Sequence, residues 1–247
     1  MNPFLFLYNE FLWRPLFNGL VWSYNVIPGN DLGVAIVVFT ASLYIILLPL
    51  QGRARRAQQD LARIQPELKQ IQARHKDNKE AQGKALMEFY AKHKVNPFSG
   101  CLIMLVQLPI LLTLFQVFRQ GFDPGMLQYL YPVVVNPGSM DPVSFGVLNL
   151  SQGNLYLGVV AAITQFFQTK LTMPIPPPVS GSSSSPDFSQ IFQKQMLYLF
   201  PVLLVVWSYT LPSALILYWT AMNLFGIVRE LIVNRKLRIV NADVKNP

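Results

Sequence analysis

The feature that most restricts how this chain can fold is a set of five long apolar segments. An α-helix needs about 20 apolar residues to cross the hydrocarbon core of a bilayer. Five candidates occur, at residues 32–51, 97–119, 155–172, 195–210 and 212–233. Only 13% of the residues are charged, whereas a soluble globular domain usually has about 25%. The sequence therefore predicts an all-α integral membrane protein with five transmembrane helices.

Basic residues are concentrated in two segments next to these spans. Of the 20 Lys and Arg residues, eleven lie between Arg53 and Lys94 and five lie between Arg229 and Lys245. Loops rich in Lys and Arg stay on the cytoplasmic side of a membrane. The charge pattern thus predicts an N-terminus outside and a C-terminus in the cytoplasm. Because neither a transit peptide nor a large outer domain is visible, we expect the plasma membrane of a bacterium.

The segments outside the spans differ in character. Residues 1–31 are rich in aromatic side chains interrupted by Glu10 and Arg14, which predicts an interfacial helix on the outer leaflet. A sixth span is the alternative. Residues 52–96 carry apolar side chains at helical spacing, which predicts a cytoplasmic helical hairpin that either recruits a partner or is simply solvated.

Three further segments complete the predicted organisation. We expect an outer loop at 120–154, a flexible Pro- and Ser-rich cytoplasmic loop at 173–194 and a basic cytoplasmic tail at 234–247.

The residue inventory argues against catalysis. His75 and His93 both lie in the 52–96 segment, and neither forms a metal-ligand cluster with Cys101. No carboxylate lies in the interior of a span, and no Gly-rich phosphate loop occurs. We therefore expect no enzyme, no catalytic residue, no metal, no cofactor and no DNA partner.

Uncharged polar residues occur at similar depths in four of the spans. The candidates for a shared polar site are Thr40, Tyr44, Gln107, Gln165, Gln168, Trp219 and Asn223. A polar group that faces lipid without a partner costs a few kcal/mol. The pattern therefore predicts either hydrogen bonds between helices, worth about 0.6 kcal/mol each, or a shared wet cavity. Such a cavity could carry polar residues part-way across the membrane, and an apolar face formed by Leu105, Leu108 and Leu111 could hold a hydrophobic stretch.

Three blocks of sequence resemble the YidC/Oxa/Alb family of membrane-protein insertases. They are VNPFSGC followed by QLPI (95–101 and 107–110), FP followed by LPSALILYW and Asn223 (200–201 and 211–219), and LPL followed by IQP (48–50 and 64–66). Their order and spacing are those of the family, and the resemblance covers roughly residues 12–235.

The resemblance implies a function and a mechanism. Members of this family insert hydrophobic segments of nascent membrane proteins, and help them fold, without nucleotide or metal. A hydrophilic groove receives the polar flank of the client chain, and its apolar segment leaves along the second and fourth spans. By position, Thr40 and Trp219 match the groove, and Leu105, Leu108 and Leu111 match the slide. The hairpin would recruit clients, and the ribosome and the general secretion translocon are possible partners besides the lipid bilayer.

One position departs from the family pattern. The family usually has an arginine in the first span five residues before the proline that is Pro49 here, and this chain has Tyr44. Three interpretations follow. The groove is polar but neutral, or Arg53 or Arg55 reaches in from the cytoplasmic mouth in place of the missing arginine, or insertase activity is weakened or specialised. Arg53 lies about 14 Å beyond Tyr44 along a helix.

Two other functions remain compatible with the sequence. A channel or small-solute transporter would account for a polar cavity but not for the basic hairpin. An assembly chaperone without independent insertase activity would not insert a lone chain, and it would act only when a folding partner of that chain is present.

Overall fold

Helices make up most of this protein in the computed structural model, which describes residues 3–96, 102–120, 123–173 and 188–245. For residues 102–105, 188–194 and 234–245 only the backbone is described. The elements are α1 (Pro3–Tyr8), the π-helical η1 (Asn9–Trp13), α2 (Arg14–Val26), α3 (Leu32–Arg74), α4 (Lys79–His93), α5 (Leu102–Gln120), the 3-10 helix η3 (Pro124–Tyr129), β1 (Val143–Ser144), β2 (Leu148–Asn149), α6 (Leu155–Thr172), α7 (Phe188–Trp207) and α8 (Ser213–Lys245).

Two helices in the described part of the chain are both long enough and apolar enough to cross a membrane. They are Leu32–Arg74 and Ser213–Val233, and Gln195–Trp207 is a shorter apolar helix. The predicted all-α architecture with apolar helices is confirmed at this level. The count of five spans and their orientation stay predictions.

Three helices are longer than the predicted spans. Helix α8 continues for 33 residues, through the predicted basic tail as far as Lys245. Helix α3 continues for 43 residues, so that the first predicted span and the first arm of the predicted hairpin are one helix. Its middle is rich in Ala, Arg and Gln, which favour helix. Helix α7 begins at Phe188, inside the segment predicted as a flexible loop. Residues 174–187 of that segment lie outside the described residues.

The described residues form two compact units. The first unit comprises Met1–Ile46, Pro109–Thr172 and Lys194–Pro247, and the second comprises Leu47–Leu108 and Met173–Gln193. The division falls inside α3, α5 and α7; in α5 it lies at Pro109 and in α3 close to Pro49.

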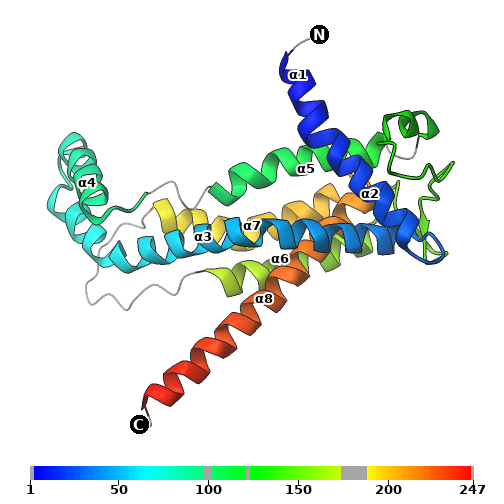
Figure 1. Cartoon of the computed structure of the whole chain (residues 1–247). Helices are drawn as coiled ribbons and strands as arrows, with labels where there is room; N and C mark the ends of the chain where they lie inside the picture. The colour runs from blue at the N-terminus through cyan, green and yellow to red at the C-terminus, as the bar shows by residue number, and fades with distance from the viewer. Residues whose placement is uncertain (1–2, 97–101, 121–122, 174–187, 246–247) are drawn as a thin grey trace. The chain divides into compact units, whose positions relative to one another are not determined.

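The core of the first unit lies where α2, the start of α3, the second half of α5 and the start of α8 meet (Figure 1). Phe17, Ile36, Phe118 and Tyr218 are fully buried there, one from each helix. A smaller cluster of Ala161, Leu204 and Ile216 joins α6, α7 and α8. Helix α8 takes part in both clusters.

The segment between α5 and α6 folds back onto the start of α3. Within it, β1 pairs with β2 in a short antiparallel hairpin. Asp31 holds this hairpin, because its carboxylate accepts hydrogen bonds from Ser144 Oγ at 2.5 Å and from the Phe145 N–H at 2.7 Å. The same carboxylate caps α3 by accepting from the Val34 N–H at 3.0 Å.

The Asp31 carboxyl titrates below its ordinary range. Burial by itself raises its pKa, but the hydrogen bonds from Phe145, Ser144, Val34 and Gly33 favour the charged form and outweigh burial. The net effect lowers the pKa of Asp31 below its ordinary value of 3.8.

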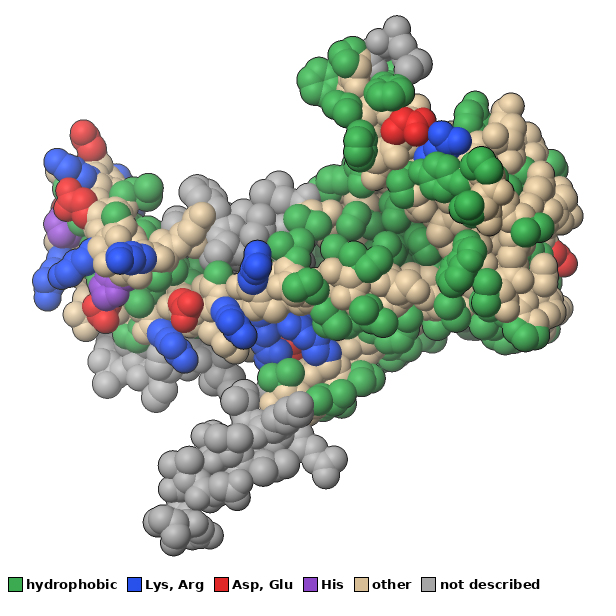
Figure 2. All heavy atoms as spheres, in the orientation of Figure 1, with side chains coloured by type: hydrophobic (Ala, Val, Ile, Leu, Met, Phe, Trp, Pro, Cys, Tyr) green, Lys and Arg blue, Asp and Glu red, His purple; other side chains and the backbone are tan. Residues whose placement is uncertain are grey.

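The second unit contains a helical hairpin formed by the end of α3 and by α4. Gln82 Nε2 donates to the Gln72 carbonyl oxygen at 2.8 Å, and His93 Nε2 lies 3.8 Å from Glu67 Oε2. These two pairs make the arms antiparallel. Charged side chains gather over both arms, as Figure 2 shows. The helical hairpin expected within residues 52–96 is thus present, and its cytoplasmic location stays a prediction.

Candidate functional site

Helices α6 and α8 lie against each other and carry most of the predicted polar site. Trp219 of α8 donates its indole Nε1–H to Gln165 Oε1 of α6 at 2.9 Å. The Gln165 amide nitrogen in turn donates to Thr169 Oγ1 at 2.9 Å. This chain of hydrogen bonds orients the indole ring of Trp219 from one side.

Aromatic packing orients Trp219 from another direction. The centroids of the Phe200 and Trp219 rings are 5.3 Å apart and the rings are tilted by 46°. Phe200 belongs to α7, so Trp219 joins three helices that all contribute to the smaller cluster. Neither Thr169 nor Phe200 was among the predicted site residues. The four-residue spacing of Gln165 and Thr169, which places them on one helix face, could have identified Thr169.

A second polar pair lies one helical turn along α8. Asn223 is buried, and its Nδ2 donates to Thr164 Oγ1 at 3.3 Å and lies 3.5 Å from the Ala161 carbonyl oxygen. Gln168 packs close to Gly226, since a Cβ placed on that glycine would lie 3.1 Å from Gln168 Cγ. Three predicted residues of α6 and α8 besides Trp219 are thus at one interface. Of these residues, Gln165 and Asn223 form side-chain hydrogen bonds across the two helices.

Two predicted residues of α3 belong to the same unit. Thr40 is fully buried, and its hydroxyl donates to the Ile36 carbonyl oxygen at 2.6 Å, within its own helix. Tyr44 is buried, and its ring centroid lies 5.7 Å from that of Phe225 of α8. Tyr44, at the position where the family usually has arginine, therefore faces the same helix as Trp219 and Asn223.

The remaining predicted residues contribute less to this picture. Gln107, Leu108, Arg53 and Arg55 belong to the second unit, and their membership of a common groove stays a prediction. Leu111 packs against the main core of the first unit. Leu105 lies in α5, but its side chain is outside the described residues.

The polar side chains of this interface named above are uncharged. Amide, hydroxyl and indole groups donate and accept hydrogen bonds but do not exchange protons near neutral pH. Within the described residues no group of three or more His, Cys, Asp and Glu side chains could hold a metal ion. The arrangement is suited to holding polar groups inside an apolar surrounding.

These features define an α-helical membrane protein whose apolar helices carry a neutral polar network. The chain belongs to the family described as the 60Kd inner membrane protein, whose model matches residues 22–241. The resemblance seen in the sequence blocks is thereby confirmed.

Proteins named membrane protein insertase YidC are among its relatives. The one from Fusobacterium nucleatum is 34% identical over 207 residues, which is 84% of this chain and 88% of the relative. The one from Geobacter sulfurreducens is 28% identical over 233 residues, and the one from Francisella tularensis subsp. novicida is 30% identical over 220 residues. This chain spans only 38% and 35% of the length of these two relatives, although the matches cover 93% and 87% of this chain.

Proposed function

We propose that this protein is a membrane protein insertase that places hydrophobic segments of nascent membrane proteins into the bilayer and helps them fold. The observation that carries the proposal is the match to the Fusobacterium nucleatum insertase, which covers most of both chains. The clients would be nascent membrane proteins. The ribosome and the general secretion translocon are further candidate partners, since the 52–96 hairpin and the 234–247 tail are basic.

The proposed topology has five spans, with the N-terminus outside and the C-terminus in the cytoplasm. The spans are the first part of α3, followed by α5, α6, α7 and the first part of α8. Sixteen of the 20 Lys and Arg residues then lie in the hairpin and the C-terminal segment, both on the cytoplasmic side. The β1–β2 hairpin and η3 lie on the outer side.

In the proposed mechanism, the polar flank of a client chain enters between the spans that carry amide and hydroxyl groups. Gln165 and Trp219 exchange their mutual hydrogen bond, and Asn223 its bond to Thr164, for bonds to the client, which lowers the cost of taking its polar groups out of water. No nucleotide is required, because partitioning of the apolar segment into lipid supplies the free energy. At about 0.3–0.6 kcal/mol per Leu, Ile, Phe or Val residue, a dozen such residues contribute on the order of 5 kcal/mol.

The exit path in this proposal follows the lipid-facing sides of α5 and α7. Leu108 and Leu112 of α5 and Tyr198 and Val202 of α7 are exposed, as a surface in contact with client or lipid would be. Because apolar side chains continue along both helices, an apolar client segment stays in contact with apolar groups while it moves outward.

Tyr44 makes the proposed groove neutral. A phenol ring packed near Phe225 can hydrogen-bond a client, but it does not attract an acidic flank as arginine would. We therefore infer that this protein prefers clients whose translocated flank carries little negative charge.

Site-specific photo-crosslinking tests the proposal. A photoreactive amino acid is placed at Leu112 of α5, at Ile163 of α6 or at Tyr44 of α3, and ribosome-bound chains with one hydrophobic span are presented. Leu112 and Ile163 are both 52% exposed. Crosslinks to the client span from Leu112 but not from Ile163 are expected, together with crosslinks to the polar flank from Tyr44. Equal crosslinking from Leu112 and Ile163 would indicate nonspecific contact through lipid. Solute flux through liposomes containing only this protein would instead support a channel.

A further inference from the structure

The helix formed by α1, η1 and α2 has two dissimilar halves. From Trp13 onward it contributes buried side chains to the main core, including Phe17 and Leu20. Before that point Leu5, Phe6 and Leu7 are all exposed, and α1 contains no buried residue. Apart from the Tyr8 hydroxyl, its sequence PFLFLY carries no polar side chain. An amphipathic helix lying flat on a membrane needs a polar face, which α1 lacks.

The polar contacts of this helix show which way its N-terminal end runs. Asn25 Nδ2 donates to the Val135 carbonyl oxygen at 2.6 Å, in the segment that follows α5. Asn18 Nδ2 donates to the Tyr129 carbonyl oxygen at 3.2 Å, nearer to α5. Tyr8 donates its hydroxyl to Gln116 Oε1 at 3.0 Å, inside α5 itself. Followed toward its N-terminus, the helix therefore passes from the outer segment to the side of a span.

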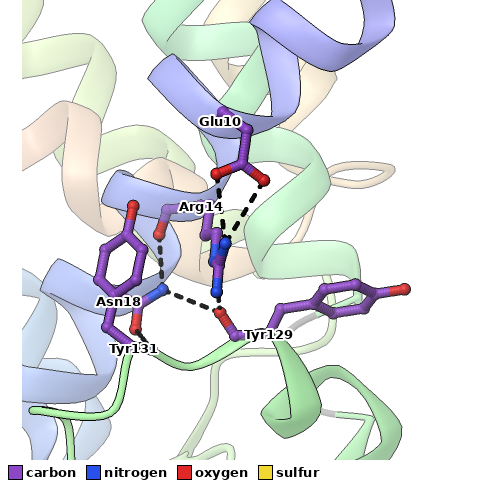
Figure 3. A network of polar contacts seen from close by, with 5 residues as sticks. All are labelled: Glu10, Arg14, Asn18, Tyr129 and Tyr131. Carbon is purple, nitrogen blue, oxygen red and sulfur yellow. Dashed lines mark hydrogen bonds and ion pairs between the residues drawn. The ribbon is translucent and has the colours of Figure 1, made fainter. Parts of the chain in front are cut away.

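A network at the middle of the helix is suited to the boundary between headgroups and acyl chains. Figure 3 shows Arg14 between Glu10 and the Tyr129 carbonyl oxygen, with distances of 3.2 Å to Glu10 Oε2 and 3.1 Å to the carbonyl oxygen. The guanidinium also lies over the Tyr131 ring, 4.7 Å from its centroid. Charge neutralised in this way, next to tyrosines, is typical of the membrane interface.

The position of Tyr8 along α5 indicates how deep Tyr8 lies in the membrane. Arg119 is exposed near the end of α5, where a charged side chain reaches the interface. Gln116 lies one turn earlier, about 4.5 Å further into the membrane. Tyr8 bonds at that level, and Leu5 to Leu7 continue beyond it.

We propose that α1 enters the acyl-chain region of the outer leaflet beside α5, with lipid as its partner. The inference rests on the orientation proposed above, but not on insertase activity. Its basis is the progression of contacts from Val135 to Gln116 together with an N-terminal turn that is apolar on every side. Such a wedge would displace lipid next to the outer half of α5.

Depth measurement by spin labelling tests this inference. In liposomes containing the full chain with Cys101→Ser, a nitroxide is attached at Leu5→Cys, Leu7→Cys or Phe11→Cys, and its collision rates with oxygen and with a water-soluble nickel chelate are compared. Reference labels are Val202→Cys on exposed α7 and Val147→Cys, where Val147 is 87% exposed between β1 and β2. The ratio of oxygen to nickel collisions should rise several-fold from Phe11 to Leu5 and approach that of Val202.

Three results would overturn the inference. Equal intermediate ratios at Phe11 and Leu5 would show a helix lying flat at the interface, and a ratio at Leu5 like that of Val147 would show a helix in water or covered by another protein. A water-like ratio at Val202 would contradict the proposed spans, and the inference with them. Insertion of a client by the Leu5→Cys liposomes reports on the insertase function separately.

Discussion

Gln165 and Trp219 show how single side chains determine the polarity of the proposed groove. The indole N–H and the amide oxygen satisfy each other across α6 and α8. In an apolar surrounding an unpaired donor or acceptor is costly, so this pair is the resting arrangement of groups that a client would have to displace. The neighbouring Asn223–Thr164 contact has the longer distance of 3.3 Å, and longer hydrogen bonds are weaker. We therefore expect a client to displace it more readily.

A double-mutant cycle should detect the Gln165–Trp219 bond. Gln165→Leu leaves the Trp219 N–H without its acceptor, and Trp219→Phe leaves the Gln165 carbonyl without its donor. Each substitution should lower the free energy of unfolding by about 1–3 kcal/mol, and the double variant should lose less than the sum. Unfolding by detergent titration measures the values. Strict additivity would mean that the two side chains do not interact, and Gln128→Leu on the exposed outer segment serves as the control.

At the scale of elements, close approach between helices depends on glycines at particular places. Gly158 of α6 lies against Ser208, directly after α7, and a Cβ on Gly158 would overlap the serine side chain. Gly153 lies similarly close to backbone oxygens, with Tyr209 O 2.5 Å from where its Cβ would be. The start of α6 can therefore pack against the end of α7 only because both positions lack a side chain.

Gly158→Ala and Gly83→Ala form a matched pair that tests this packing. Both glycines are in helices, but a Cβ at Gly83 meets no atom within 4 Å. Gly83→Ala should raise the free energy of unfolding by about 0.5–1 kcal/mol, because alanine restricts the unfolded chain. Gly158→Ala should lower it by about 1–3 kcal/mol through overpacking. If both variants were stabilised, the tight contact between α6 and Ser208 would be wrong.

Asp31 links two elements, because it caps α3 and holds the β1–β2 hairpin. Its pKa is lowered in the folded protein, so the charged carboxylate stabilises the fold at pH values above its ordinary pKa of 3.8. That contribution should decline as the pH falls below 3.8 and through the lower folded-state pKa. Asp31→Asn should lower the free energy of unfolding by about 1 kcal/mol at pH 7.

The pH dependence provides the check on Asp31. Thermal unfolding of the wild type and of Asp31→Asn is compared at pH 7 and near pH 3. The difference in stability between them should shrink at the lower pH, since the wild-type carboxyl is then becoming protonated. An unchanged difference would exclude a role for the charge. The other carboxyl groups titrate in both proteins and cancel in the comparison.

For the whole molecule, orientation in the membrane decides where clients would enter and leave in the proposed function. The two compact units share α3, α5 and α7, and α3 and α5 pass from one unit to the other close to a proline. The second unit carries the charged hairpin, and the first carries the polar α6–α8 interface and the segment between α5 and α6. In the proposed topology these parts serve the cytoplasmic and the membrane stages of insertion.

Sidedness can be measured with two single-cysteine variants in a Cys101→Ser background. Val147→Cys lies between β1 and β2, and Lys84→Cys lies on exposed α4. An impermeant thiol reagent should label Val147→Cys in intact cells and Lys84→Cys only in inverted vesicles. Labelling of Lys84→Cys from outside would reverse the proposed orientation. Labelling of both from one side would require an even number of spans between them.

The helix order and several polar residues of the α6–α8 interface could be predicted from sequence, but the extents of the elements could not. The apolar stripe through Ile64 and Leu68 predicted the hairpin, and both side chains are buried in it. The continuation of α3 past residue 51 was not predicted, because a change from apolar to charged side chains alters the surroundings of a helix without ending it. The β1–β2 hairpin also escaped prediction, because two-residue strands have too few residues to show alternation.

What the sequence by itself determined is the class of protein, the order of its apolar helices and its family. Hydropathy, charge position and short sequence blocks are local properties, so no knowledge of contacts is needed to recognise them. Only the tertiary structure decided which polar groups satisfy one another. Trp219 and Gln165 are 54 positions apart, Asn223 and Thr164 are 59 apart, and Ser144 and Asp31 are 113 apart. A hydrogen bond depends on the distance and angle between two atoms. Over such separations these are set by the packing of whole helices and not by residue type.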